Sequence, residues 1–137
     1  MKNLRLEASQ NTPYVEVDPE EGVVVIKGNS YPENAIEFYR PIIDMVEEIY
    51  LSSSEPITVN LEFSYFNTLS SKCFIDFFRM LKRSENSSRK AIINWSYEKN
   101  GDEMREIGED YADLLDMQFN FCGIESDYST LSQCYST

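Results

Sequence analysis

Hydroxyl and amide side chains are concentrated in one short stretch, residues 65–72, with the sequence Tyr65-Phe66-Asn67-Thr68-Leu69-Ser70-Ser71-Lys72. Asn67, Thr68, Ser70 and Ser71 are all residue types that cap a helix start, because their side-chain oxygens accept hydrogen bonds from its free N–H groups. Those same N–H groups favour an anion, including a phosphate attached to one of the local hydroxyls. The residues alone therefore leave two interpretations open, a well-capped loop and a phosphorylation site.

The flanking residues place this stretch between a strand and a helix. Apolar residues alternate through Ile57–Phe63, which is the period of a half-buried strand. After the stretch, Phe74, Phe77, Phe78 and Leu81 recur at helical spacing. We therefore predict a strand-to-helix junction, with the helix running from about residue 71 to residue 84.

The first thirty residues predict an antiparallel hairpin. Leu4 and Leu6 open a segment that continues through Tyr14–Val17, and a turn at residues 18–22 contains Pro19 and Gly22. The β-branched run Val23–Ile26 follows, and such a run is typical of a strand that is covered on both faces.

The next segment predicts the first helix. Ser30 has the features of an N-cap, Glu33 completes a capping box, and Pro32 is tolerated in a first turn. Pro41 lies inside the helix and predicts a kink or a break. The predicted buried positions recur at intervals of three or four: Ala35, Tyr39, Ile42, Val46 and Ile49.

The remaining elements complete an α/β pattern. Ala91–Tyr97 is a predicted strand, Asp102 a predicted cap of the third helix, and residues 118–121 a short last strand. The order β-β-α-β-α-β-α-β predicts a mostly parallel sheet with an N-terminal β-hairpin and three crossover helices. We expect a single domain over residues 1–124 and a polar, mobile C-terminal tail over residues 125–137.

Composition limits the classes of partner. The chain has 137 residues and a formal net charge of -12, and its basic residues form no cluster larger than a pair. Binding to nucleic acid or to an anionic membrane surface is therefore not expected. Three cysteines without metal-ligand spacing are most simply free thiols in a reducing compartment, and nothing at the start resembles a signal peptide. These features predict a cytoplasmic protein.

No set of residues predicts catalysis. The chain contains no histidine, which excludes Ser–His and Cys–His pairs, and it has no Gly-rich phosphate loop. Cys73 lies near a helix start, which could lower its pKa, but a buried helical cysteine is the commoner case. We predict no catalytic residue, no metal and no cofactor. A solvated helix face is the favoured reading of the acidic residues in the third helix: Asp102, Glu103, Glu106, Glu109, Asp110 and Asp113.

The junction also carries a resemblance to a known family. Tyr65-Phe66-Asn67-Thr68 with Ser70-Ser71-Lys72 resembles the central motif of the SiaC family of bacterial regulatory phosphoproteins, whose fold is STAS-like. The segment Gly28-Asn29-Ser30-Tyr31-Pro32-Glu33-Asn34-Ala35 is similar to a second family motif, and weaker similarities lie at residues 12–13, 95–98 and 108–111. The chain departs from the family pattern at Leu69, where a serine is expected, and at residues 99–101, where acidic residues are expected.

The resemblance implies a function. In that family the threonine that matches Thr68 is the phosphorylation site, and the partners implied are a cognate kinase, an opposing phosphatase and a diguanylate cyclase bound by the unphosphorylated form. Parallel strands end at one edge of a sheet, so we expect the two specific motifs to form one partner-binding face, with the loop after Tyr97 nearby. The predicted binding residues are Ser30, Tyr31, Pro32, Glu33, Asn34, Tyr65, Phe66, Asn67, Leu69, Ser70, Ser71 and Lys72.

Two alternatives remain open on the sequence. The chain could be a constitutive adaptor in which Thr68 is only a helix cap. It could also be a small enzyme that uses the acidic third helix.

Overall fold

The computed structural model describes residues 2–125 and 132–136, and in the second of these ranges only the backbone. One seven-stranded sheet runs in sequence order, β1-β2-β3-β4-β5-β6-β7. Its strands are β1 (Leu4–Leu6), β2 (Tyr14–Asp18), β3 (Val23–Ser30), β4 (Ile57–Phe66), β5 (Ala91–Glu98), β6 (Phe119–Ile124) and β7 (Ser132–Ser136). The helices are α1 (Ala35–Ser52), α2 (Thr68–Arg83) and α3 (Asp102–Leu115).

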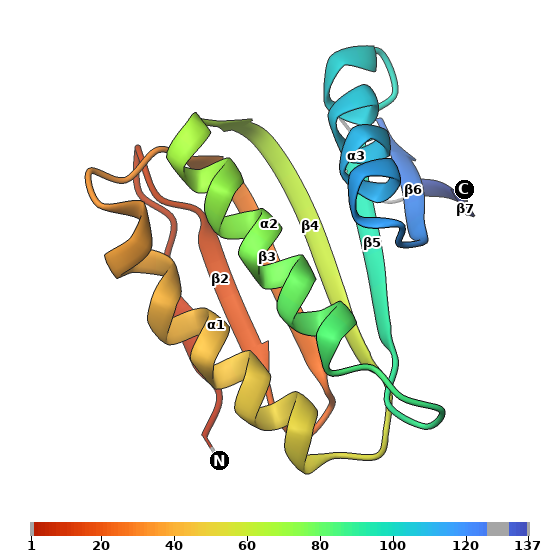
Figure 1. The fold of residues 1–137 in the computed structure, drawn as a ribbon. Coiled ribbons are helices and arrows are strands. Elements are labelled where there is room, and N and C mark those ends of the chain that lie inside the picture. The colour runs from red at the N-terminus through yellow and green to blue at the C-terminus, as the bar shows by residue number, and fades with distance from the viewer. Residues whose placement is uncertain (1, 126–131, 137) are drawn as a thin grey trace.

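The centre of the sheet is parallel and its margins are antiparallel. Strands β3 to β6 pair in parallel, each joined to the next by one helix, while β1, β2 and β7 pair antiparallel. Because each crossover steps to the next strand in the same direction, α1, α2 and α3 all lie on one face of the sheet (Figure 1). The predicted α/β class, the hairpin and the three crossover helices are confirmed.

The core lies between this sheet face and the helices. Every apolar residue that helical spacing predicted to be buried in α1 is buried, as are Phe74, Phe77, Phe78 and Leu81 of α2. Strand β3 differs from its prediction: Val24 and Ile26 are buried, but Val23 and Val25 are only half-buried. The strand is covered by helices on one face only, and its β-branched run does not mark a second covering layer.

Several predicted details of these elements differ in the structure. The first segment contains two strands, β1 and β2, rather than one. Helix α1 continues through Pro41, so of the predicted kink or break the break does not occur. The N-cap of α3 is Gly101, which makes no side-chain cap, and Asp102 is already helical.

The C-terminal segment also differs from the prediction. Residues 132–136 form β7, which pairs with β6 and places Cys134 opposite Cys122 in the register, where a mobile polar tail was predicted. Residues 126–131 and 137 lie outside the described residues. Cys122 is disulfide-bonded, so the prediction that all three cysteines are free is wrong. Cys73 is a free, buried thiol.

Candidate functional site

Thr68 is the first residue of α2, directly after the carboxyl end of β4. The helix begins three residues earlier than predicted, and Asn67 is its N-cap, with Oδ1 accepting a hydrogen bond of 2.9 Å from the Ser70 N–H. Thr68 is exposed. Within the described residues its hydroxyl makes no hydrogen bond, so the role of cap that one alternative gave to Thr68 belongs to Asn67.

A buried group of three hydroxyls, which we call the hydroxyl cluster, lies beneath this junction. It consists of Ser30, Tyr39 and Ser70. Ser30 Oγ lies 2.5 Å from the Tyr39 hydroxyl and 2.8 Å from Ser70 Oγ, and Ser70 Oγ also donates to the Ser30 carbonyl over 3.1 Å. The Asn67 N–H donates to the same carbonyl at 3.1 Å. These bonds fix the end of β3 to the start of α2.

The cluster corrects the predicted role of Ser30. Ser30 is the last residue of β3 and is fully buried, so it does not cap α1. The N-cap of α1 is Asn34, whose Oδ1 accepts from the Glu37 N–H at 3.0 Å. Both Ser30–Glu33 and Asn34–Glu37 have the capping spacing, and the pairing of Ser30 with Phe66 in the sheet decides between them.

Burial sets the protonation of the tyrosines around the junction. Burial raises the pKa of Tyr39 well above its ordinary value, and the hydrogen bond from Ser30 opposes this only in part. Burial likewise raises the pKa of Tyr111, whose hydroxyl is hydrogen-bonded to Ser71 and so links α3 to α2. Both phenols are neutral at physiological pH, as ordinary tyrosines are, and each is hydrogen-bonded, Tyr39 to Ser30 and Tyr111 to Ser71.

Cys73 behaves as a core residue. Burial, and next the nearby charge of Asp76, raise the pKa of its thiol. A raised pKa disfavours the reactive thiolate, which agrees with the favoured interpretation of Cys73 as a buried helical cysteine. Trp95 and Tyr97 of β5 are buried as well.

The two predicted motifs meet at one end of the sheet. The rings of Tyr31 and Tyr65 contact edge to face, with centroids 5.8 Å apart, and the hydroxyl cluster joins the same two segments beneath them. Tyr65 is 54% and Leu69 50% exposed, so both side chains are accessible to a partner. We call the surface formed by Tyr31, Glu33, Asn34, Tyr65, Thr68, Leu69 and Lys72 the Thr68 face.

Not every predicted binding residue can reach this surface. Ser30, Pro32 and Ser70 are buried, so in this conformation they support the Thr68 face from below. Phe66, Asn67 and Ser71 are only partly exposed. Phe66 packs in the interior against Phe74, with ring centroids 5.0 Å apart. The adjacency of the two motifs is a finding of the structure, whereas partner binding by their residues remains a prediction.

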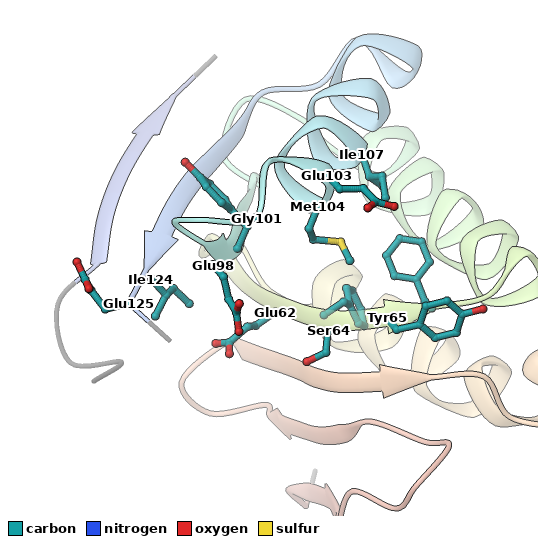
Figure 2. Close-up of a pocket in the computed structure, with 13 residues that line it drawn as sticks. Glu62, Ser64, Tyr65, Glu98, Gly101, Glu103, Met104, Ile107, Ile124 and Glu125 are labelled. Carbon is teal, nitrogen blue, oxygen red and sulfur yellow. The ribbon is translucent and has the colours of Figure 1, made fainter. Parts of the chain in front are cut away.

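A pocket of about 480 Å³ opens beside the Thr68 face (Figure 2). Its walls come from the carboxyl ends of β4 and β5 and from the first turns of α3, and it includes Tyr65 and Phe66. The expectation that the loop after Tyr97 lies near the face is confirmed, because Glu98 and Gly101 line the pocket. The contributions of Met104 and Ile107 were missed, because helical spacing marks them only as core positions.

The acidic residues of α3 are arranged as a solvated helix face with local ion pairs. Arg105 lies 3.2 Å from Glu109 and 3.6 Å from Asp102. Among the described residues, no group of three or more potential ligands is placed to hold a metal ion. Across the same part of the chain, no helix is both long and apolar enough to cross a bilayer.

Comparisons with known proteins agree with this architecture. The family model for SiaC family regulatory phosphoproteins matches residues 6–124. An uncharacterized protein of Pseudomonas aeruginosa (strain UCBPP-PA14) is 29% identical over 121 residues, which are 88% of this chain and 94% of the relative.

Solved structures give the same result. The crystal structure of apo-SiaC from Pseudomonas aeruginosa has a TM-score of 0.80 and 28% identity, and the match covers 92% of this chain and 100% of that one. A chain in the crystal structure of the diguanylate cyclase SiaD in complex with its activator SiaC, from the same species, has a TM-score of 0.81 and 27% identity. That match covers 86% of this chain and 97% of the other. This chain therefore belongs to the SiaC family of regulatory phosphoproteins.

Proposed function

We propose that this chain is a non-enzymatic binding protein that is switched by phosphorylation of Thr68. In its unmodified form it binds and activates a diguanylate cyclase. A kinase phosphorylates Thr68 and releases the cyclase, and a phosphatase restores the binding form. The cyclase part of the proposal draws on the relative SiaC, which is the activator of SiaD in the solved complex.

The observation that carries the proposal is the position of Thr68. Thr68 is exposed and its hydroxyl makes no hydrogen bond with any described residue, although the hydroxyls of Ser70 and Ser71 and the amide of Asn67 are engaged. A kinase can therefore modify it without breaking a hydrogen bond of the fold. Exposed Tyr65 and Leu69 flank it, so a protein that docks on these side chains also covers Thr68.

A phosphate on Thr68 leaves the fold intact. It adds about -1.5 to -2 charges at the start of α2, where the helix dipole favours an anion by ~0.3–1 kcal/mol. The net charge of -12 opposes this, but exposed charges beyond about 8 Å are largely screened at physiological salt. Lys72 lies one turn along α2, is exposed, and can approach the phosphate.

The same phosphate weakens docking. A partner that covers the Thr68 face must remove water from a dianion that its own surface was not built to pair. Without a matched cation this desolvation costs several kcal/mol, which corresponds to orders of magnitude in affinity. The sign of the switch therefore follows from local chemistry: the unmodified protein binds, and the phosphoprotein does not.

Intact mass tests the modification itself. The chain would be co-expressed with candidate Ser/Thr kinases, alongside a Thr68→Val variant as control. We expect one added phosphate on the native chain and none on the variant. If the native chain remains unmodified with every kinase that phosphorylates other SiaC relatives, Thr68 is not a switch. The constitutive adaptor would then be the better description of the function.

A further inference from the structure

The pocket beside the Thr68 face exists because two neighbouring strands separate. Strands β4 and β5 pair from Ile57↔Ala91 to Glu62↔Ser96 and then part. Beyond that point β4 stays with β3 as far as Ser30↔Phe66, and β5 stays with β6 as far as Glu98↔Ile124 (Figure 1). The opening lies at the carboxyl ends of parallel strands, where open α/β sheets commonly bind ligands.

The pocket combines apolar walls with three carboxylates. Its apolar lining includes Met104 and Ile107, which are half-buried on α3. Figure 2 shows Glu62 and Glu98 next to each other on one side, while Glu103 projects from α3 on another. The lining residues contain no lysine or arginine.

Three carboxylates of the pocket lack an ion pair within the described part of the chain, although Lys27 lies opposite Glu62 in the β3–β4 register. Glu62, Glu98 and Glu103 form no ion pair or hydrogen bond with any described side chain, whereas a fourth lining carboxylate, that of Glu125, lies 3.6 Å from Lys99. Arg105 is the cation nearest in sequence to Glu103, and it is engaged by Asp102 and Glu109. Like charges around a partly apolar cavity favour a cation.

We propose that this pocket receives a lysine or arginine side chain of the partner protein, together with an apolar side chain next to it in the partner. The methylene stem of such a cation packs on apolar walls while its charged end reaches Glu62 and Glu98. An anionic ligand is disfavoured by the carboxylates, and a bare metal ion would leave the apolar wall uncovered. Charge complementarity thus selects a basic, amphipathic protein segment.

The pocket and the Thr68 face form one continuous surface, because Tyr65 and Phe66 line the pocket and lie within the junction motif. The proposal therefore rests on the proposed function for the location of the partner. It does not depend on the phosphate, since the carboxylates act on the unmodified protein.

The first test measures binding of a diguanylate cyclase to the unphosphorylated chain by titration calorimetry at two salt concentrations. We expect the Glu62→Gln/Glu98→Gln variant to bind at least about tenfold more weakly, with a smaller salt dependence. The matched control is Glu48→Gln/Glu85→Gln, which removes the same charge from exposed positions outside the pocket and should bind like the native chain. Equal affinities for the two variants would overturn the proposal.

The second test uses only the native chain, so it requires no cyclase and does not depend on whether a variant folds. The native chain would be titrated with the peptides acetyl-Leu-Arg-Leu-amide, acetyl-Leu-Gln-Leu-amide and acetyl-Leu-Glu-Leu-amide and followed by amide NMR. The arginine peptide should shift the amides of Glu98, Gly101 and Met104, and the other two should not. Equal shifts with the glutamine peptide would indicate a purely apolar occupant, and shifts confined to other amides would place the cation elsewhere; either result contradicts the proposal. The peptide titration uses neither phosphate nor cyclase. Its result can therefore contradict the pocket proposal independently of the proposal that phosphorylation of Thr68 controls binding.

Discussion

The two ends of helix α2 use their polar groups in opposite ways. At its C-terminal end, Lys82 Nζ donates to the carbonyls of Leu115 and Asp116, at 2.6 and 3.0 Å, and so binds the end of α3. Arg89 donates to the Ser84 carbonyl at 3.0 Å, and the Tyr50 hydroxyl donates to the Arg89 carbonyl at 3.2 Å. At this end, charged and polar side chains hold elements of the fold together.

At the N-terminal end the bonding groups lie below the surface and the surface itself is left unpaired. The hydroxyl cluster holds β3, α1 and α2 together from inside. Above it, Thr68 makes no described hydrogen bond, Lys72 makes no described ion pair, and Tyr65 and Leu69 are half exposed. Stabilising contacts therefore lie beneath the surface and the proposed binding side chains lie on it, so we expect that each can be changed without the other.

The largest expected contrast is in partner binding. Tyr31→Ala removes an aromatic ring from the Thr68 face, while Glu85→Ala changes an exposed residue at the opposite end of α2. We expect Tyr31→Ala to weaken cyclase binding at least about tenfold, which is the scale of a central aromatic contact, and Glu85→Ala to leave it unchanged. If titration calorimetry gave the reverse order, the binding surface would lie near Glu85 and the Thr68 face would not be the docking site.

The next effect is on stability at the N-terminal end. Ser30→Ala leaves the buried Tyr39 hydroxyl without its closest partner, at a cost of about 1–3 kcal/mol in urea unfolding. The double variant Ser30→Ala/Tyr39→Phe removes both partners and should lose less than the single changes added together. If Ser30→Ala unfolds like the native chain, the hydroxyl cluster does not secure the junction.

A smaller loss is expected at the C-terminal end. Lys82→Met keeps the apolar stem and removes the bonds to the Leu115 and Asp116 carbonyls. Because the Lys82 side chain is 45% exposed, water replaces part of the interaction, and a loss of about 1 kcal/mol is expected without any change in cyclase affinity. A loss of affinity in this variant would show that the two ends are coupled.

The smallest expected effect is that of Thr68→Ala on folding. Asn67 remains the N-cap, so the variant should lose at most about 1 kcal/mol. Urea unfolding with unchanged circular dichroism would check this. A loss of roughly 3 kcal/mol would instead mean that the hydroxyl is a buried structural partner.

Much of the fold and the position of the Thr68 face could be predicted from the sequence, because both depend on local patterns. Phe74, Phe77 and Phe78 carry the period of α2, and the order of strands and helices brings residues 30–34 beside residues 65–72. Such adjacency follows from parallel topology alone.

The details that were missed depend on long-range contacts. Ser30 and Asn34 look equally good as caps, and only the extension of β3 along β4 makes Ser30 a buried strand residue. In the same way, Asn67 and not Ser70 caps α2, and the Ser70 hydroxyl bonds instead to Ser30, forty residues away. The pocket arises where β4 and β5 part after Glu62, and no local signal in the sequence marks that point.

The central claim is that phosphate on Thr68 changes docking and not folding. The most direct measurement compares stoichiometrically phosphorylated and unmodified protein for affinity to a diguanylate cyclase, with circular dichroism on the same samples. We expect the two spectra to coincide, the unmodified protein to bind, and the phosphoprotein to bind more weakly by orders of magnitude. A Thr68→Asp variant should release only in part, since its carboxylate has one charge and a planar shape. Tighter binding by the phosphoprotein would contradict the account and make phospho-Thr68 a mark that basic residues on the partner recognise.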